Sequence, residues 1–201
     1  MKFRRDFILI GSKALIADLH LGLVRFYDRD IIRRAIEIAE KAKTIVVVGD
    51  LKHLGKPSPI EEFFREVGGI AELIVIRGNH DIGIVGYKGI RIGKYGIFHG
   101  HAIPDDEIFQ AKHLIFAHAH PSILIQDEVG GYKERVFLLG ELEIDNEKKR
   151  VTVMPAFNDL CASTPVNLEK PAGFMFRRHN YSDWYAMLLD GTVLSLNSLI
   201  I

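Results

Sequence analysis

The sequence predicts an α/β fold, and two segments of its first half show why. Residues 44–48 are β-branched at every position, which is typical of a parallel strand that is covered on both faces. Residues 29–42 instead place Ile and Ala at helical spacing, with charged side chains on the opposite face. Such segments alternate along the first half of the chain. That alternation implies right-handed crossovers and a parallel sheet with helices on its faces.

The first half contains three expected strands, each ending close to a polar side chain. A polar loop with two prolines, over residues 55–59, separates the second strand from a short helix. In chain order, we expect a strand at 14–17, a helix at 29–42, a strand at 44–48, a helix at 60–67 and a strand at 73–76.

The second half has more β character and is not purely parallel. The charged residues 145–149 suggest the turn of one hairpin, and Asp190-Gly191 is the expected tight turn of another. Residues 155–170 are rich in Pro, Ser, Thr and Asn and suggest irregular surface. The expected strands are 95–98, 114–117, 122–126, 135–144, 150–153, 184–189 and 192–196.

Size and composition favour one domain in a reducing compartment. With 201 residues and 48% hydrophobic content, residues 1–201 suit one domain with a sizeable core. The sole cysteine, Cys161, excludes an intramolecular disulfide and is interpreted as a small buried residue. The apolar run near the N-terminus ends at Gly11, which is too short for a signal peptide, and no stretch is long enough for a membrane span. We therefore expect a cytoplasmic protein with no membrane partner.

Charge and the chain end say less about partners. The 26 basic and 26 acidic residues cancel, so no global field favours nucleic acid or an anionic membrane, although a local basic patch remains open. Oligomeric state is not indicated.

The aliphatic ending Leu199-Ile200-Ile201 would be costly to leave in water. We expect it to be covered, packed against the strand at 184–189 in preference to a subunit interface.

Five strand ends carry side chains that bind metals or move protons. In an open α/β sheet the carboxyl ends of the strands lie at one edge, so groups that are distant in sequence can converge there. A single histidine at a strand end is more often an ordinary hydrogen-bonded residue, but agreement among five strand ends favours function. The candidates are Asp18, His20, Asp50, Asn79, His80, His99, His118 and His120.

Oxygen and imidazole groups without a thiolate indicate a site for Mn, Fe, Zn, Co or Ni rather than a structural zinc site. Seven ligands are too many for one tetrahedral ion, but they suit two ions that share a carboxylate. Two such cations would lower the pKa of a shared water from near 15.7 to about 7, and the resulting bridging hydroxide would attack phosphorus in line. This arrangement of two ions is found in many phosphoester hydrolases.

The ordered motifs resemble those of the calcineurin-like metallophosphoesterases, over about residues 14–168. A narrower likeness, to small archaeal phosphoesterases and bacterial DNA-ligase-associated ones, is carried by residues 17–22, 49–53 and 154–157. Ala117 stands where the family usually has glycine, which leaves the local backbone geometry open. The five matching blocks are Asp18-x-His20, Gly49-Asp50, Gly78-Asn79-His80-Asp81, His99-Gly100-His101 and His118-x-His120.

The resemblance implies a metallophosphoesterase-type β-sandwich of mixed sheets flanked by helices. It also implies two divalent transition-metal ions, with Mn²⁺ expected first and Fe, Zn, Co or Ni as alternatives. His80 would lie near the metals without binding them, and would contact the phosphate or protonate the leaving oxygen. The implied ligands are Asp18, His20 and His120 for the first metal, Asn79, His99 and His118 for the second, and Asp50 as the bridge.

Residues near these motifs are candidates for supporting roles. His53 and His101 are candidates to orient ligands or substrate, although solvated loop histidines are as common. Arg25 and Arg77 are candidates to hold a phosphate, although most arginines are simply solvated. Asp81 is expected to fix its loop or orient His80, and Lys52 has no assigned role.

The function that follows is dinuclear-metal-dependent hydrolysis of phosphoesters. We expect a phosphodiesterase, with a nucleotide or nucleic acid as a candidate substrate in the manner of a nuclease. One alternative is a phosphomonoesterase or nucleotide phosphatase. Another is a non-catalytic protein-binding scaffold, because a retromer subunit carries this fold with a degraded site. Every ligand position is filled in this chain, and that favours catalysis.

Overall fold

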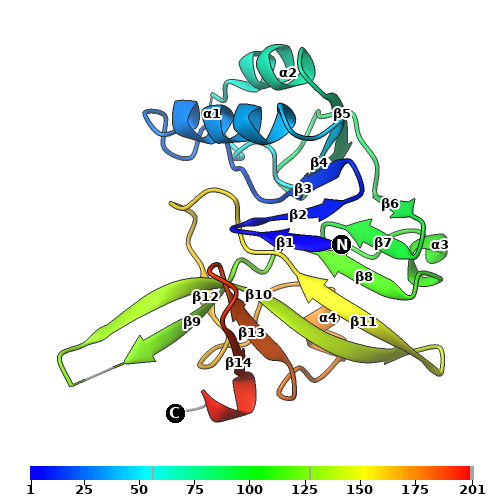
Figure 1. Cartoon of the computed structure of the whole chain (residues 1–201), viewed down its shortest axis with the longest axis vertical. Coiled ribbons are helices and arrows are strands. Elements are labelled where there is room, and N and C mark those ends of the chain that lie inside the picture. Colours follow the sequence, from blue (N-terminus) through cyan, green and yellow to red (C-terminus); the bar gives the residue numbers. More distant parts are fainter. Residues whose placement is uncertain (56, 127, 200–201) are drawn as a thin grey trace.

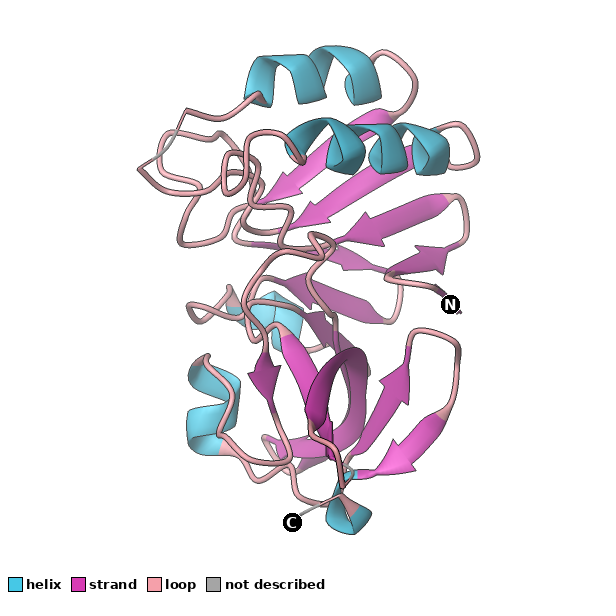
Figure 2. Ribbon diagram, turned by 90° about the vertical axis from the view of Figure 1, so that its left-hand side faces the viewer, coloured by secondary structure: helices cyan, strands magenta, loops and turns pink. Residues whose placement is uncertain are grey.

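The computed structural model describes residues 1–55, 57–126 and 128–199. These residues form two mixed β-sheets, of five and nine strands, that pack face to face with helices outside them (Figures 1 and 2). The expected α/β sandwich of mixed sheets flanked by helices is therefore confirmed.

The five-stranded sheet is parallel where the sequence predicts it to be and antiparallel at its N-terminal edge. The pairs β3/β4 and β4/β5 are parallel, whereas β1/β2 and β2/β3 are antiparallel. The first two strands were not predicted. In spatial order the sheet contains β1 (Lys2–Arg4), β2 (Phe7–Ile10), β3 (Lys13–Ile16), β4 (Thr44–Val48) and β5 (Glu72–Ile76).

Helices α1 (Asp28–Ala39) and α2 (Ile60–Gly68) cover the outer face of this sheet (Figure 2). Helix α1 ends three residues earlier than residues 29–42 predict. The backbone N–H of Lys43 donates to Ser12 O at 2.8 Å, so the chain must leave the helix to enter the sheet. Ala42 is nevertheless buried in the same core, which explains why it continues the apolar pattern.

The nine-stranded sheet is organised by β10, whose first part pairs with β9 and whose remainder pairs with β11 and β13. Both predicted hairpins are confirmed, but the first turn is narrower than residues 145–149. Only Asp145 and Asn146 have positive φ there, and Glu147 already begins a strand. The path is β12 (Thr164–Pro165), β9 (Pro121–Gln126), β10 (Gly131–Ile144), β11 (Glu147–Val153), β8 (His113–Phe116), β7 (Tyr95–Phe98) and β6 (Gly89–Ile92), with β13 (Tyr185–Leu188) and β14 (Val193–Ser195) branching from β10.

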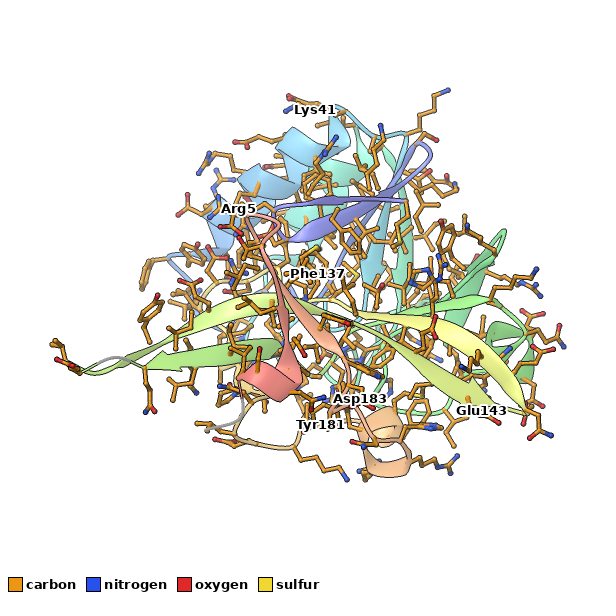
Figure 3. The ribbon with its side chains drawn as sticks, turned by 60° about the horizontal axis from the view of Figure 1, so that its bottom comes forward. Arg5, Lys41, Phe137, Glu143, Tyr181 and Asp183 are labelled. Atoms are coloured by element: carbon orange, nitrogen blue, oxygen red, sulfur yellow. The ribbon has the colours of Figure 1, made fainter. Side chains whose placement is uncertain are left out.

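Alternation along the strands divides the core into layers. Val46 and Val48 face the space between the sheets, whereas Ile45 and Val47 face the two helices. Phe137, on β10, lies at the centre between the sheets and is 1% exposed (Figure 3). A side chain of this kind stabilises the fold by about 1.5–3 kcal/mol when it is fully buried.

A third core layer lies beneath the nine-stranded sheet and includes the short helices α3 (Asp106–Phe109) and α4 (Phe174–Arg178), together with a 3₁₀ turn at Leu196–Ser198. Leu199 packs against this layer. The other two residues of the aliphatic chain end, 200 and 201, lie outside the described residues. Among those described, no helix is long and apolar enough to cross a membrane.

The prediction that residues 155–170 form irregular surface is wrong for their first part. Residues 155–158 are buried, and the backbone N–H of Phe157 donates to Ala17 O at 2.7 Å, which extends the line of β3. The guanidinium of Arg34 lies 4.2 Å from the centre of the Phe157 ring. In residues 155–158 the polar side chain, Asn158, donates to the backbone at Leu19 O and is not exposed to solvent.

Candidate metal centre

The seven predicted ligands all follow the carboxyl ends of strands that meet where the two sheets face each other. Three of these strands belong to the five-stranded sheet and two to the nine-stranded one. Asp18 and His20 follow β3, Asp50 follows β4, Asn79 follows β5, His99 follows β7, and His118 and His120 follow β8.

Five of these seven residues have a backbone conformation that side chains other than glycine rarely adopt. The φ values are 53° at Asp18, 44° at His20, 47° at Asp50, 69° at His118 and 42° at His120. Each such residue costs roughly 1–2 kcal/mol. Strain of this kind persists only where the surrounding structure imposes it, and it concentrates at functional sites.

Hydrogen bonds between the loops impose this conformation. The backbone N–H of Asp18 donates to Gly49 O at 3.1 Å, and that of His20 donates to Asp50 O at 2.8 Å. The loop after β3 is thus fixed directly to the loop after β4. The N–H of His118 donates to the Asp18 carboxylate at 3.2 Å, which joins the second sheet to the first.

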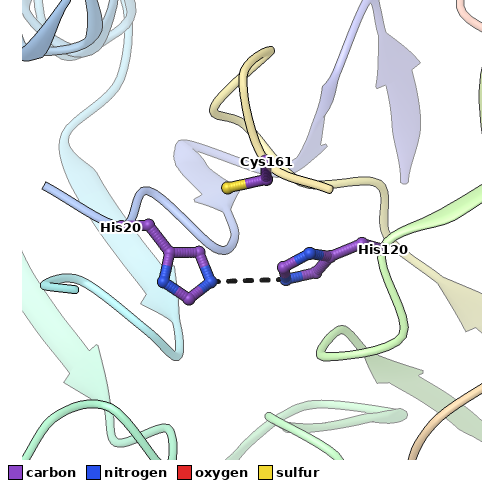
Figure 4. A group of neighbouring side chains, drawn as sticks. All are labelled: His20, His120 and Cys161. Carbon is purple, nitrogen blue, oxygen red and sulfur yellow. Dashed lines mark hydrogen bonds between the residues drawn. The ribbon is translucent and has the colours of Figure 1, made fainter. Parts of the chain in front are cut away.

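Asp18, His20 and His120 form one half of the centre. Asp18 is fully buried, and His120 Nε2 lies 3.4 Å from its Oδ1 atom. The Nε2 atoms of His20 and His120 lie 3.4 Å apart (Figure 4). His120 Nδ1–H donates to Ala162 O at 3.0 Å, so a neutral His120 ring presents its Nε2 lone pair to a metal.

Asp50, His99 and His118 form the other half, and Asp50 belongs to both. Its Oδ2 atom lies 3.6 Å from His20 Nε2 and 3.7 Å from His99 Nε2. The donor atoms of Asp50, His99 and His118 lie within 4.8 Å of one another, and the same holds for Asp18, His20 and Asp50. Asn79 is exposed and lines a cavity of about 510 Å³ together with His99.

Without a cation the ionisation of the cluster is mixed. Although burial opposes the shift, Asp18 raises the pKa of His120 to about 9, so this ring must give up a proton when it binds a metal. Burial lowers the pKa of His20 to about 3 and that of His118 to about 4, so both rings are neutral, as metal ligands must be. Burial alone would raise the pKa of Asp18, but His120 and His99 hold it well below its ordinary value. Burial, with Asp18 nearby, raises the pKa of Asp50. Two close carboxylates among imidazoles are the donor set of a transition-metal pair.

Comparison with known proteins agrees with this geometry. Residues 13–165 match the family model described as calcineurin-like phosphoesterase. The chain belongs to this family. No curated protein matches the sequence.

Three solved structures are similar to this chain to different degrees. The nuclease MPE of Pseudomonas putida is 16% identical, with a TM-score of 0.65, and the match covers 96% of this chain and 93% of that one. At this identity the likeness to the nuclease MPE concerns the fold alone. A predicted phosphoesterase of Streptococcus pneumoniae is 12% identical over 90% of this chain and 91% of its own, with a TM-score of 0.42. Vps29 of Entamoeba histolytica is 19% identical over 71% of this chain and 98% of its own, with a TM-score of 0.37.

In this family member, His80 and His53 lie on the His20 side of the centre. The ring of His80 is centred 4.8 Å from that of His20 and 5.1 Å from that of His53. The backbone N–H of His80 donates to Asp50 Oδ1 at 2.8 Å, and that of Leu54 donates to His80 Nδ1 at 3.1 Å. His53 Nδ1 lies 3.4 Å from His20 Nδ1, within reach to orient that ring.

His101 lies on the opposite side of the centre, with its Nδ1 atom 3.0 Å from His99 Nδ1. Asp81 fixes the loop after β5, because its carboxylate accepts hydrogen bonds from the backbone N–H groups of Gly78 at 2.8 Å and Lys52 at 3.2 Å. Arg25 is not brought to the centre. It lines a separate cavity beside Asp28, and none of the seven predicted ligands lines that cavity.

Two glycines of the phosphoesterase are required because a ligand occupies the space of a side chain. A Cβ atom on Gly49 would lie 2.1 Å from the ring of His99, and one on Gly78 would lie 2.0 Å from Asp50 Oδ1. Gly49 also has φ of 85°. Ala117, by contrast, has no positive φ, so the glycine usual in the family is not needed there.

Asn158, which no sequence motif identified, supports the loop after β3. Its side-chain amide donates to Leu19 O at 2.9 Å, and its backbone N–H donates to Asp18 O at 3.4 Å. Arg34 and Arg135 hold the neighbouring segment, through Phe157 O and Ala156 O respectively. The only sequence signal was the likeness at residues 154–157, which assigns no role to the asparagine that follows.

Cys161 was expected to be an ordinary core residue, but the structure places it beside the metal centre. Its Sγ atom and the nearest nitrogens of His20 and His120 lie within 4.8 Å of one another (Figure 4). The thiol is 3.9 Å from Asp18 O. Burial and the nearby carboxylates raise its pKa, so it stays a protonated thiol at neutral pH.

Proposed function

We propose that this phosphoesterase hydrolyses phosphodiesters with two divalent transition-metal ions held by the seven predicted ligands. The position of Asp50 carries the proposal. An ion bound at about 2.1 Å to two ligands requires them to lie within about 4.2 Å of each other. Asp50 Oδ2 meets this limit with His20, at 3.6 Å, and with His99, at 3.7 Å, which are proposed to bind different ions. Asp18 Oδ1 also meets it with His99 and His120, at 2.9 and 3.4 Å, so the motif resemblance is what assigns the bridge to Asp50.

Bound cations would supply an activated water and neutralise charge that develops on phosphorus. The chain supplies the proton for the leaving oxygen. Because Leu54 N–H donates to His80 Nδ1, the neutral His80 ring carries its own proton on Nε2. An imidazole held in this position is suited to donate that proton.

Several observations support a diester, and nucleic acid in particular, as the substrate. The structurally similar Pseudomonas putida protein is described as a nuclease, and the motifs at residues 17–22 and 49–53 resemble those of ligase-associated phosphoesterases. We propose Mn²⁺ as the working metal because oxygen and imidazole donors suit it. A single cysteine fits action in the reducing cytoplasm.

Metal analysis tests the two-metal site. Protein stripped with chelator and reloaded with Mn²⁺ should bind two ions per chain. Asp50→Ala removes the shared ligand and should lower that number. Exposed Asp145→Ala, in a turn far along the chain, is the matched control and should keep two ions. Saturation of the natural chain at one ion would contradict the proposal, as would an unchanged number in Asp50→Ala.

Activity measurements test the substrate class. The manganese-loaded protein should hydrolyse bis(p-nitrophenyl) phosphate and single-stranded DNA faster than p-nitrophenyl phosphate. Faster hydrolysis of the monoester would favour the phosphomonoesterase instead. Absence of turnover on all three substrates, with two metals bound, would favour the scaffold.

A further inference from the structure

A cavity of about 510 Å³ adjoins the His99 side of the metal centre. Two proposed ligands of the second metal, Asn79 and His99, form part of its wall. Arg77 and Lys88 contribute positive charge to the same cavity, the buried carboxylate of Asp81 also lines it, and Ile82 contributes an exposed apolar side chain, 66% accessible. A cavity with this lining fits an anionic group attached to a partly apolar body.

A backbone hydrogen bond and the close packing of its Cγ atom hold Arg77 in place. It directly follows β5, and its N–H donates to Tyr87 O at 2.9 Å, next to an isolated parallel bridge between Ile76 and Tyr87. Gly86 lies so close that a Cβ atom there would be 3.1 Å from Arg77 Cγ. The side chain therefore leaves a fixed point, one residue before Gly78-Asn79.

The guanidinium of Arg77 has no hydrogen bond or ion pair with any residue that the structure describes. Lys88 differs, because its ammonium lies 3.3 Å from the carboxylate of Asp105. Among the described residues, Arg77 is thus the cation of this cavity that makes no ion pair, because the Asp81 carboxylate in the same wall accepts from the backbone N–H groups of Gly78 and Lys52. A guanidinium matches the geometry of a phosphate and binds it through two parallel hydrogen bonds.

The two sides of the centre divide a diester between them. His80, the proposed proton donor, lies against His20, so the leaving half of the substrate lies on that side. The retained half would then extend towards His99 and His101, which both line the cavity. A substrate with a single phosphodiester group carries no further phosphate in its retained half. In a nucleic-acid strand the retained half carries a further phosphate, and that phosphate would reach Arg77.

We infer that Arg77 binds the phosphate next to the scissile one, so that the substrate is a nucleic-acid strand with at least two phosphodiester groups. This inference rests on the proposed phosphodiesterase activity and specifies its substrate. Lys88 contributes a weaker charge to the same phosphate, and Ile82 contacts the sugar or base that joins the two phosphates.

The decisive comparison uses a trinucleotide, TpTpT, and a dinucleotide, TpT, which lacks the second phosphate. The natural protein should show a higher kcat/KM on the trinucleotide. Arg77→Gln keeps a similar size without the charge, and should lower kcat/KM on the trinucleotide about tenfold more than kcat/KM on TpT or bis(p-nitrophenyl) phosphate. Arg91→Gln is the matched control, because Arg91 is an exposed arginine on β6 outside the cavity. It should keep the preference.

Binding without turnover gives a second readout. Fluorescence anisotropy of a labelled oligothymidylate, measured in EDTA, should show weaker binding by Arg77→Gln than by Arg91→Gln. The slope of log affinity against log salt should fall by about 0.7 when one phosphate contact is lost. Equal losses in the two variants would overturn the inference. So would a loss on TpT as large as that on TpTpT.

Failure of the two proposals can be told apart. A natural protein that hydrolyses bis(p-nitrophenyl) phosphate but binds no oligothymidylate at low salt retains the proposed function and refutes the role of Arg77. A natural protein that binds oligothymidylate through Arg77 but hydrolyses no diester refutes the proposed function, and leaves the cavity as a nucleic-acid site.

Discussion

At the scale of single residues, His80 shows how one hydrogen bond sets the role of a side chain. Its Nδ1 atom accepts from Leu54 N–H, and its own backbone N–H is held by Asp50. Both bonds fix the ring beside the metal ligands. A ring whose lone pair is already used by the backbone is better suited to give a proton from Nε2 than to bind an ion.

Replacing His80 should therefore separate turnover from metal binding. We expect His80→Ala to keep two Mn²⁺ ions and to lose about a hundredfold or more in kcat on a diester with an alkyl leaving group. The loss should be smaller on bis(p-nitrophenyl) phosphate, because nitrophenolate leaves without a proton. His118→Ala is the comparison, and should lose metal. If the two variants lose metal to the same extent, His80 is a ligand.

The proposed metal ligands and His80 were recognisable in the sequence because each follows a short apolar run in a motif of characteristic spacing. Asn158 and Cys161 were not, because their positions depend on how residues 154–161 turn under the loop after β3. No local pattern encodes that path. The polar composition of residues 155–170 suggested surface, whereas the side-chain amide of Asn158 donates a hydrogen bond to the backbone of the loop after β3.

At the scale of elements, the strands that precede the proposed ligands were predictable, whereas several strands without buried apolar runs were not. Strand β4 is buried at every position, so its composition alone identifies it. Strands β1 and β6 have only three and four residues and include exposed charged side chains. The first part of β10, residues 131–134, is exposed and charged as well. Pairing with β9 makes it a strand, and pairing partners cannot be read from a local pattern.

Strand β8, which precedes His118 and His120, begins with a histidine of a different kind. His113 Nε2 lies 2.9 Å from Thr152 Oγ1 on the neighbouring strand β11. Burial, together with Arg150 and Lys94, lowers the pKa of His113 to about 4. The folded protein thus keeps this ring neutral at a pH where the unfolded chain protonates it.

This difference makes the stability of the sheet depend on pH. Between pH 6.5 and about 4 the unfolded chain binds a proton at His113 that the folded chain does not, so acidification lowers the free energy of unfolding. We expect His113→Gln to remove about 1–2 kcal/mol of that loss, allowing for solvent screening of a partly exposed ring. Urea unfolding of both proteins at pH 7 and pH 4.5 measures it. Parallel losses in the two proteins would exclude this role.

At the scale of the whole molecule, the chain beyond the family match completes the core. Residues 13–165 contain every predicted ligand, yet Phe174, Phe176 and Trp184 fill the layer beneath the nine-stranded sheet. The fit is close, since a Cβ atom on Gly140 would lie 2.3 Å from the Trp184 ring. This segment also reaches the metal centre. A Cβ atom on Gly173 would lie 3.5 Å from the ring of His118.

Removing the Trp184 side chain should accordingly destabilise the entire fold. We expect Trp184→Ala to cost about 3–5 kcal/mol in the free energy of unfolding, because it leaves a cavity beneath β10. Tyr185→Ala removes an adjacent aromatic side chain that is 50% exposed, and should cost about 1 kcal/mol or less. Urea unfolding distinguishes the two. Equal costs would show that the C-terminal segment is an appendage and not part of the core.

The left-handed backbone at five metal ligands has a consequence for how the protein changes under selection. Glycine adopts that conformation without the penalty of roughly 1–2 kcal/mol that Asp18 or His120 incurs. A variant library selected for heat resistance alone, in the absence of metal, would weigh that penalty against the hydrogen bonds of the side chains, such as those that the carboxylates of Asp18 and Asp50 accept from backbone N–H groups. A library selected for turnover would keep all five strained residues. Selection for activity therefore preserves these proposed ligands against a backbone penalty that glycine would not incur.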